Sequence, residues 1–306
     1  MPEGAVAGAA GERRESRMTW TRGMRSEAAT QECPWVLRGD ARRQRLVILR
    51  ALIAGLLIFW SATVGAPGAN ERVVQVAAAA DLKFAMDEIA QAFHRHHPDI
   101  EVQVTYGSSG NFFAQLSNRA PFDLYFSADV DYPRKLITQG LAVKDTEFLY
   151  AVGRIVVWVP RRSPLDLEHL GMQALSDPSV RKVAIANPKH APYGRAAEAA
   201  MKTLGVYEQV QERLVYGENI AQTAQFIHTG AADIGIIALS LALAPAMHEE
   251  GRYWEIPLDT YPRIEQGGVI LPWAKDMAAA GAFRSFMLAP EGKAVLRRYG
   301  FFLPGE

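Results

Sequence analysis

The sequence predicts an α/β protein of two lobes with a ligand cleft between them. First, residues 73–139 repeat the order of strand, turn and helix three times, which is typical of an open sheet with helices on its faces. Second, residues 154–238 contain another such set. Third, a final strand and helix over 268–299 are placed to return to the first set. We therefore expect two lobes joined by two crossovers of the chain.

The first set is expected to form lobe one, at 70–152 plus 262–306. Its apolar run at 73–79 predicts a buried strand, and the helical spacing after it predicts a helix with Asp81 as N-cap. The turn 107–110 (GSSG) separates a second strand from a second helix. The remaining expected elements are a strand at 124–127, a helix at 131–139 and the closing helix at 290–299.

The second set is expected to form lobe two, at 153–261. The glycine pair Gly267 and Gly268 follows it, and we expect this pair to let the chain pass between the lobes. The expected elements of lobe two are strands at 155–159, 183–186 and 234–238, and helices at 195–204 and 220–228.

Composition argues against several function classes. The 306 residues are 49% hydrophobic and 22% charged, with 33 basic and 33 acidic residues. The first 66 residues hold ten Arg and six acidic residues, so the remainder is slightly acidic and a nucleic-acid partner is not expected. The single cysteine, Cys33, precedes the predicted lobes. The lobes therefore have no internal disulfide, thiolate zinc site or cysteine nucleophile.

The N-terminal part has the pattern of an export signal at 42–69. Arginines precede the apolar run 51–60, and small residues follow it. The run is shorter than the roughly 20 residues that span a bilayer, although an uncleaved anchor that includes 46–49 is an alternative. Residues 1–41 show no apolar period and are interpreted as a disordered or mis-started extension. We expect a periplasmic protein.

Four turns of one type precede predicted helices. They contain Asp81, the pair Ser108 and Ser109, Tyr193, and Ile220. A helix N-terminus offers unpaired N–H groups and a partial positive charge, so it attracts anions without Lys or Arg. Ligands of open α/β sheets bind at the carboxyl ends of strands, where these helices begin. Three of these turns also have a simpler interpretation: a helix cap for the serine pair, a half-buried loop aromatic for Tyr193 and a core residue for Ile220.

Five segments resemble the periplasmic molybdate-binding protein (ModA) family of ABC importers. They are 76–82 (VAAAADL), 106–110 (YGSSG), 121–129 (PFDLYFSAD), 187–194 (NPKHAPYG) and 298–301 (RYGF). The resemblance implies a type II periplasmic-binding-protein fold that closes on tetrahedral molybdate or tungstate. It implies no catalysis and no cofactor, a ModB-like permease in the inner membrane as partner, and a monomer.

The resemblance also implies the ligand contacts. The family's serine ligand falls on Ser109, with Ser108 beside it, and its loop ligand falls on Tyr193. The backbone donor of the later helix falls on Ile220, and the first-turn ligand falls on Asp81. No lysine or arginine is expected in the gap between the lobes.

Two positions depart from the family pattern. Ala238 stands where some members carry a tyrosine. A carboxylate at Asp81 would repel a dianion by a few kcal/mol at about 4 Å and moderate dielectric. We expect Asp81 to turn outward as an N-cap acceptor, while its own N–H or that of Leu82 faces the anion. The alternative is a protonated carboxyl that donates to the oxyanion.

Three other functions stay open at this point. The site could prefer another oxyanion such as sulfate or phosphate. An enzyme on the same fold, of the porphobilinogen-deaminase kind, would need a cofactor-bearing cysteine that the lobes lack. A sensory module would need a signalling segment joined to the lobes, and the sequence shows none.

Overall fold

A computed structural model describes residues 72–306. The predicted extension at 1–41 and the predicted signal peptide at 42–69 lie outside the described residues. Within the described range, no helix is both long and apolar enough to cross a membrane.

The first sheet has the strand order β2-β1-β3-β10-β4. Strands β1, β2 and β3 are parallel, and β10 runs antiparallel to both β3 and β4. The strands are β1 (Arg72–Ala79), β2 (Ile100–Gly107), β3 (Leu124–Ser127), β4 (Phe148–Gly153) and β10 (Ile264–Ile270). The helices are α2 (Lys83–His96), α3 (Ser109–Ser117), α4 (Asp131–Thr138), α11 (Met277–Leu288) and α12 (Pro290–Arg298), with short 3-10 turns η1 (Ala80–Leu82) and η2 (Lys144–Thr146).

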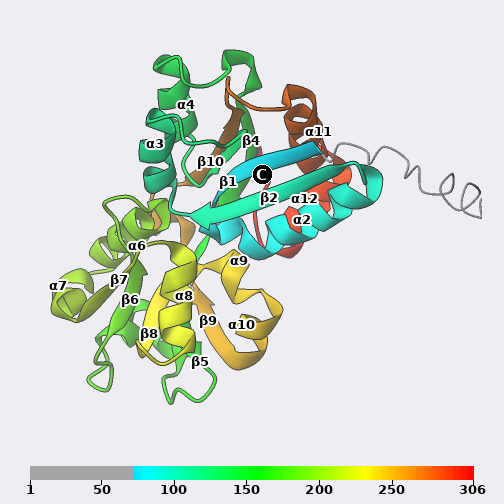
Figure 1. Ribbon diagram of the computed structural model, residues 1–306. Coiled ribbons are helices and arrows are strands. Elements are labelled where there is room, and N and C mark those ends of the chain that lie inside the picture. The colour runs from blue at the N-terminus through cyan, green and yellow to red at the C-terminus, as the bar shows by residue number, and fades with distance from the viewer. Residues whose placement is uncertain (1–71) are drawn as a thin grey trace, which may run out of the picture. The chain divides into compact units, whose positions relative to one another are not determined.

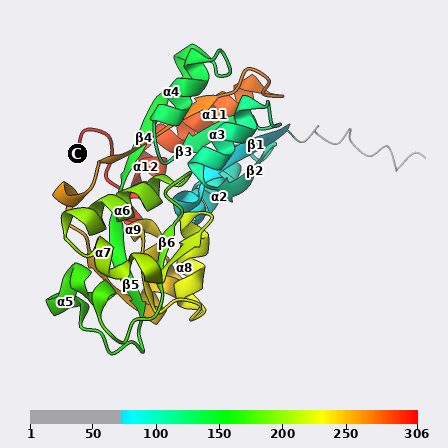
Figure 2. The same ribbon diagram turned by 90° about the vertical axis from the view of Figure 1, so that its left-hand side faces the viewer.

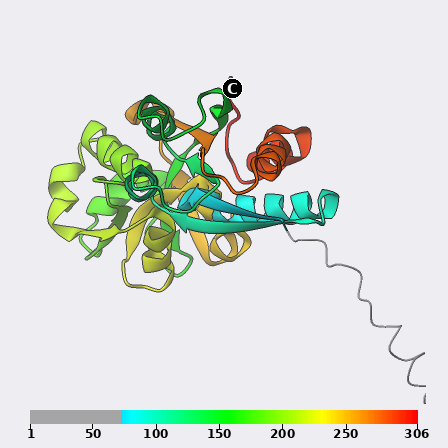
Figure 3. The ribbon, with the colours of Figure 1, turned by 45° about the horizontal axis from the view of Figure 1, so that its top comes forward.

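Helices cover both faces of this sheet because β1 has apolar residues on both sides. Val74 and Val76 face a core that includes Phe93 of α2 and Phe283 of α11. Ala77 faces the opposite core, with Leu116 and other residues of α3 and α4. Figure 1 shows α3 and α4 on one side of the sheet and α2, α11 and α12 on the other. Figure 3 shows the C-terminal helices, in red, beside α2, in cyan.

The second sheet has the order β7-β6-β8-β5-β9 and repeats the arrangement of the first. Figure 2 shows its strands β5 and β6 beside α8. Strands β6, β7 and β8 are parallel, and β5 runs antiparallel to β8 and β9. The strands are β5 (Ile155–Pro160), β6 (Val183–Ala186), β7 (Leu214–Gly217), β8 (Ile234–Ala238) and β9 (Gly251–Glu255). The helices are α5 (Leu167–Leu170), α6 (Pro192–Thr203), α7 (Tyr207–Val210), α8 (Ile220–His228), α9 (Leu239–Ala242) and α10 (Pro245–Glu250), with 3-10 turns η3 (Gly171–Ser176), η4 (Gln211–Arg213) and η5 (Leu258–Thr260).

The chain passes between the two sheets twice. Arg154 alone separates β4 of the first sheet from β5 of the second. The return runs from the end of β9, through η5, to the start of β10. Near the C-terminus, Phe302 forms an antiparallel bridge with Val152 of β4. The last segment of the chain is thus attached to the first sheet, beside the outgoing crossover.

The glycine pair does not lie at a crossover, contrary to the prediction. Gly267 and Gly268 lie inside β10, paired with β3 and β4. A Cβ at Gly268 would lie 2.5 Å from the Tyr125 carbonyl oxygen. The pair is therefore needed for close packing within the sheet. The register of β10 against β4 shifts between Gln266 and Gly267, which is the mark of a β-bulge.

Candidate functional site

Two of the turns that the sequence singled out follow strands of the first sheet and lie together at the carboxyl ends of those strands. Ala79 of β1 pairs with Gly107 of β2, and both strands run in the same direction. The residues that follow these strand ends, Asp81 in η1 and Ser109 in α3, therefore lie side by side. β3 is parallel to β1, so Ala128 follows it at the same edge. This is the edge where ligands bind to open α/β sheets.

Ser109 and Ser108 have different surroundings. The Ser109 side chain is buried, and its Oγ accepts the N–H of Ala128 at 2.9 Å. No acceptor for the Ser109 hydroxyl proton is found among residues 72–306, so this proton is free to point at a ligand. Ser108 is the N-cap of α3 and accepts the N–H of Asn111. Its Oγ also lies 3.0 Å from Nδ1 of His190, so its hydroxyl is already engaged.

Asp81 points inward, and the predicted outward cap is wrong. The residue is 1% exposed and caps no helix N–H. Its Oδ2 instead accepts a hydrogen bond from the Tyr193 hydroxyl at 2.9 Å and one from Gln266 Nε2 at 2.6 Å. Gln266 Nε2 also donates to the Tyr193 oxygen at 2.9 Å. These donors belong to α6 and β10. Two buried hydrogen bonds stabilise the carboxyl more than one bond at a solvated helix end would, so the side chain turns inward.

No basic side chain of residues 72–306 forms an ion pair with Asp81, and the pKa of this carboxyl is set by burial and hydrogen bonds. Burial is the largest influence on its pKa and raises it to about 6, against the opposing effects of the hydrogen bonds from Gln266 and Tyr193 and of the nearby N–H groups of Asp81 and Leu82. Burial also raises the pKa of the Tyr193 hydroxyl, and the charge of Asp81 adds to this. Asp81 Oδ1 and Gln266 Oε1 are buried, and neither has a hydrogen-bond partner within residues 72–306. A buried acceptor without a donor costs free energy, so this cluster lacks a donor or a proton.

Ile220 begins helix α8, which packs against η1. The N-cap of α8 is Asn219, whose Oδ1 accepts the N–H of Gln222. The N–H of Ile220 makes no hydrogen bond with any described residue, as expected in the first turn of a helix. Because α8 contacts η1, the structure brings this helix near Asp81.

Ala238, which replaces a tyrosine of some family members, ends β8 and is buried. It adds no polar group to the site. Two residues later the Ser240 hydroxyl donates to the Asp81 carbonyl oxygen at 2.7 Å, which fixes η1 against α9. Neither Ser240 nor Gln266 was predicted from the sequence. The only signal for Gln266 was a polar residue inside a buried strand.

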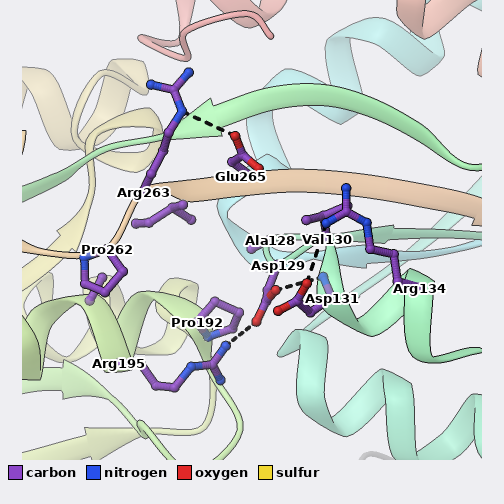
Figure 4. A pocket seen from close by; sticks show the side chains of 12 residues that line it. Ala128, Asp129, Val130, Asp131, Arg134, Pro192, Arg195, Pro262, Arg263 and Glu265 are labelled. Atoms are coloured by element: carbon purple, nitrogen blue, oxygen red, sulfur yellow. Dashed lines mark hydrogen bonds and ion pairs between the residues drawn. The ribbon is translucent and has the colours of Figure 1, made fainter. Parts of the chain in front are cut away.

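Contrary to the expectation, an arginine does lie between the lobes, because Asp129 at the end of β3 offers it a carboxylate partner across the groove. Arg195 of α6 pairs with Asp129, which follows β3, and Figure 4 shows this pair. The groove contains three basic and three acidic side chains: Arg134, Arg195, Arg263, Asp129, Asp131 and Glu265. No lysine or arginine of the described range forms a hydrogen bond with the side chain of Asp81, Ser109 or Tyr193. The site itself therefore has uncharged donors.

Comparison with known proteins shows the family of this chain. Residues 74–302 match the family described as bacterial extracellular solute-binding proteins. The molybdate-binding protein ModA of Azotobacter vinelandii is 37% identical over 259 residues, which cover 85% of this chain and 97% of that protein. The chain belongs to the ModA family. A second member, ModA of Rhodobacter capsulatus, is 38% identical over 200 residues, covering 65% of this chain and 77% of that protein.

Solved structures agree with this membership. The periplasmic molybdate-binding protein of Azotobacter vinelandii matches with a TM-score of 0.71 and 32% identity, over 76% of this chain and 99% of that one. The sulfate-binding protein SubI of Mycobacterium tuberculosis matches with a TM-score of 0.63 at 15% identity, over 76% of this chain and 88% of that one, and shows the fold alone. The predicted two-lobed periplasmic-binding-protein fold is confirmed.

Proposed function

We propose that this ModA-family protein is the substrate-binding protein of an ABC importer. It captures molybdate, or tungstate, between its lobes and delivers the anion to a ModB-like permease in the inner membrane. Besides family membership, one observation carries the proposal. Tyr193 of α6 donates to Asp81 of η1 near Ser109, and helix α8 also contacts η1. Residues from both sides of the molecule thus converge on one place.

The donors of this site suit a fully ionised oxyanion. The proposed donors are all uncharged: the hydroxyls of Ser109 and Tyr193 and the backbone N–H of Ile220. Hydrogen bonds to a charged group contribute about 1.5–3 kcal/mol each. Several of them, aided by the helix termini of α3 and α8, can offset the desolvation of a dianion. Ser108 lies beside the site and holds the start of α3.

Asp81 takes part as a carboxylic acid in this proposal. The inward position removes the outward N-cap interpretation and leaves the protonated alternative. With a proton on Oδ1, the carboxyl donates to the oxyanion, and the unpartnered atom gains a partner. The raised pKa supports this protonation, because a dianion nearby raises the pKa further.

Lobe closure is the proposed way of trapping the ligand. Lobe one is 70–152 plus 262–306, and lobe two is 153–261. Contacts between them include the Tyr193–Asp81 hydrogen bond and the N–H of Gly110, which donates to the His190 carbonyl oxygen at 2.9 Å. A ligand that touches both lobes favours the closed form by its differential affinity. The closed form is the one that docks on the permease.

The remaining properties follow from the same proposal. The protein is periplasmic, exported by the signal at 42–69, and acts as a monomer without catalysis or cofactor. Isothermal titration of the purified exported protein with molybdate, tungstate, sulfate and phosphate tests the ligand. We expect molybdate and tungstate to bind and sulfate to bind far more weakly, because a closed site sized for the longer Mo–O and W–O bonds would hold the smaller sulfate less well. A preference for sulfate or phosphate would overturn the molybdate assignment.

A further inference from the structure

Gln266 is a buried carboxamide that the proposed ligand contacts do not include. It lies on β10, is fully buried, and immediately precedes the bulge in that strand. Its Nε2 donates to Asp81 Oδ2 and to the Tyr193 oxygen, so one amide group holds two groups of the site at once. No other side chain among residues 72–306 hydrogen-bonds to both.

The hydrogen bond from Gln266 decides what the Tyr193 hydroxyl can do. A phenol has one proton to donate and can accept at its oxygen. Because Gln266 donates to that oxygen, the hydroxyl proton is directed away from the amide, toward Asp81 or a ligand. Donation into the oxygen also polarises the O–H bond, which strengthens the hydrogen bond that Tyr193 donates.

Gly153 leaves the space that this arrangement needs. It is the last residue of β4, pairs with Ile264 of β10 and directly precedes the outgoing crossover. A Cβ at Gly153 would lie 2.2 Å from the Tyr193 hydroxyl oxygen and 2.9 Å from Gln266 Nε2. The strands that lead to and from lobe two therefore both border the cluster of Asp81, Tyr193 and Gln266.

The amide oxygen of Gln266 argues against a purely structural role for this side chain. Its Oε1 is buried and has no partner within residues 72–306. Buried amides that serve only packing satisfy both ends, and an apolar residue of similar shape avoids the cost of an unmet acceptor. The amide is thus better explained by what its Nε2 contacts.

We propose that Gln266 is a positioning residue of the oxyanion site, which orients the Tyr193 hydroxyl and the Asp81 carboxyl toward the ligand. The inference rests on the proposed function of the same site. Gln266 need not touch the anion, because it acts through its two partners.

A double-mutant cycle on the exported protein tests this role by calorimetric titration with molybdate. Gln266→Met keeps the length of the side chain and removes the donor, and Tyr193→Phe removes the hydroxyl. We expect each substitution to weaken affinity by about tenfold. The double variant should be weakened clearly less than the product of the two losses, because Gln266 acts through Tyr193. Gln103→Met, on an exposed position of β2, is the matched control and should bind as the wild type does.

The outcomes separate the inference from the function. If the wild type binds molybdate and Gln266→Met binds equally well, or if the two losses multiply fully, the positioning role is wrong. If the wild type binds no molybdate at all, the proposed function fails. Should Gln266→Met not fold, as judged by circular dichroism, Gly153→Ala gives the second test. It displaces the Tyr193 hydroxyl from Gln266, and unchanged affinity in this variant would likewise contradict the inference.

Discussion

The Tyr193 hydroxyl, on α6 beside the second sheet, donates a 2.9 Å hydrogen bond to the carboxyl of Asp81 at the end of the first sheet. One hydroxyl proton cannot serve Asp81 and an anion at the same time. Ligand binding therefore requires the cluster to rearrange, and the simplest rearrangement places a proton on Asp81. The protein's response to pH, and to changes at these residues, follows from this competition.

Asp81 makes the folding stability depend on pH. Its pKa is about 6 in the folded protein against an ordinary 3.8, so the folded state binds the proton more tightly than the unfolded state. The free energy of unfolding therefore falls as pH rises from about 4 to about 6, by about 3 kcal/mol in all, and stays low above that. Thermal unfolding of the wild type and of Asp81→Asn at a series of pH values measures the difference. Asp276, whose pKa is lowered to about 2 chiefly by its hydrogen bond with Arg72, acts mainly below this window. A constant difference across pH 4–7 would contradict the prediction.

Molybdate affinity should fall as pH rises above about 6. A dianion raises the pKa of Asp81 beyond its value in the free protein, so binding takes up a proton. Above the free pKa the affinity then drops by up to about tenfold per pH unit. Titrations between pH 6 and 8.5, in buffers of different ionisation enthalpy, report both the affinity and the proton uptake. In Asp81→Asn the pH dependence of affinity and the proton uptake should both disappear. If the wild type takes up no proton, Asp81 is either ionised in the complex or remote from the anion, and the prediction is wrong.

Ser109→Ala should reduce both affinity and stability. The substitution removes a donor to the anion, which weakens binding by about tenfold or more. It also leaves the buried N–H of Ala128 without its acceptor, at a cost of about 1–3 kcal/mol in unfolding free energy. Calorimetric titration and thermal unfolding measure the two effects. Ser117→Ala, at the far end of the same helix, should leave affinity unchanged, and equal losses in both variants would point to a general disturbance of α3.

The ion pair between Arg195 and Asp129 should matter little. Both side chains are partly exposed, and exposed ion pairs contribute about 0.2–1 kcal/mol. Arg195→Gln should therefore change molybdate affinity by less than about fivefold at physiological salt. Comparing titrations at low and high salt isolates the electrostatic part. A loss of binding as large as that of Ser109→Ala would mean that this groove, rather than the edge near Asp81, holds the anion.

The repetition of strand, turn and helix was readable because each element is specified locally. The apolar run at 73–79 and the GSSG turn at 107–110 predicted β1 and the start of α3 closely. Helix α6 begins at Pro192, three residues earlier than expected, because proline suits the first turn of a helix and Tyr193 then lies inside the helix. Helix α11 was missed, since its many alanines give only a weak apolar period.

The sequence by itself determined the two-lobed α/β class, the family and the turns that carry Ser109, Tyr193 and Ile220, because strand period, turn residues and motifs are local properties of the chain. Only the tertiary structure decided the orientation of Asp81 and the presence of Gln266 and Ser240 beside it. These residues are separated from Asp81 by 185 and 159 positions along the chain. Whether a carboxyl is buried, and which donors meet it, depends on the packing of such distant segments, and no local pattern records that.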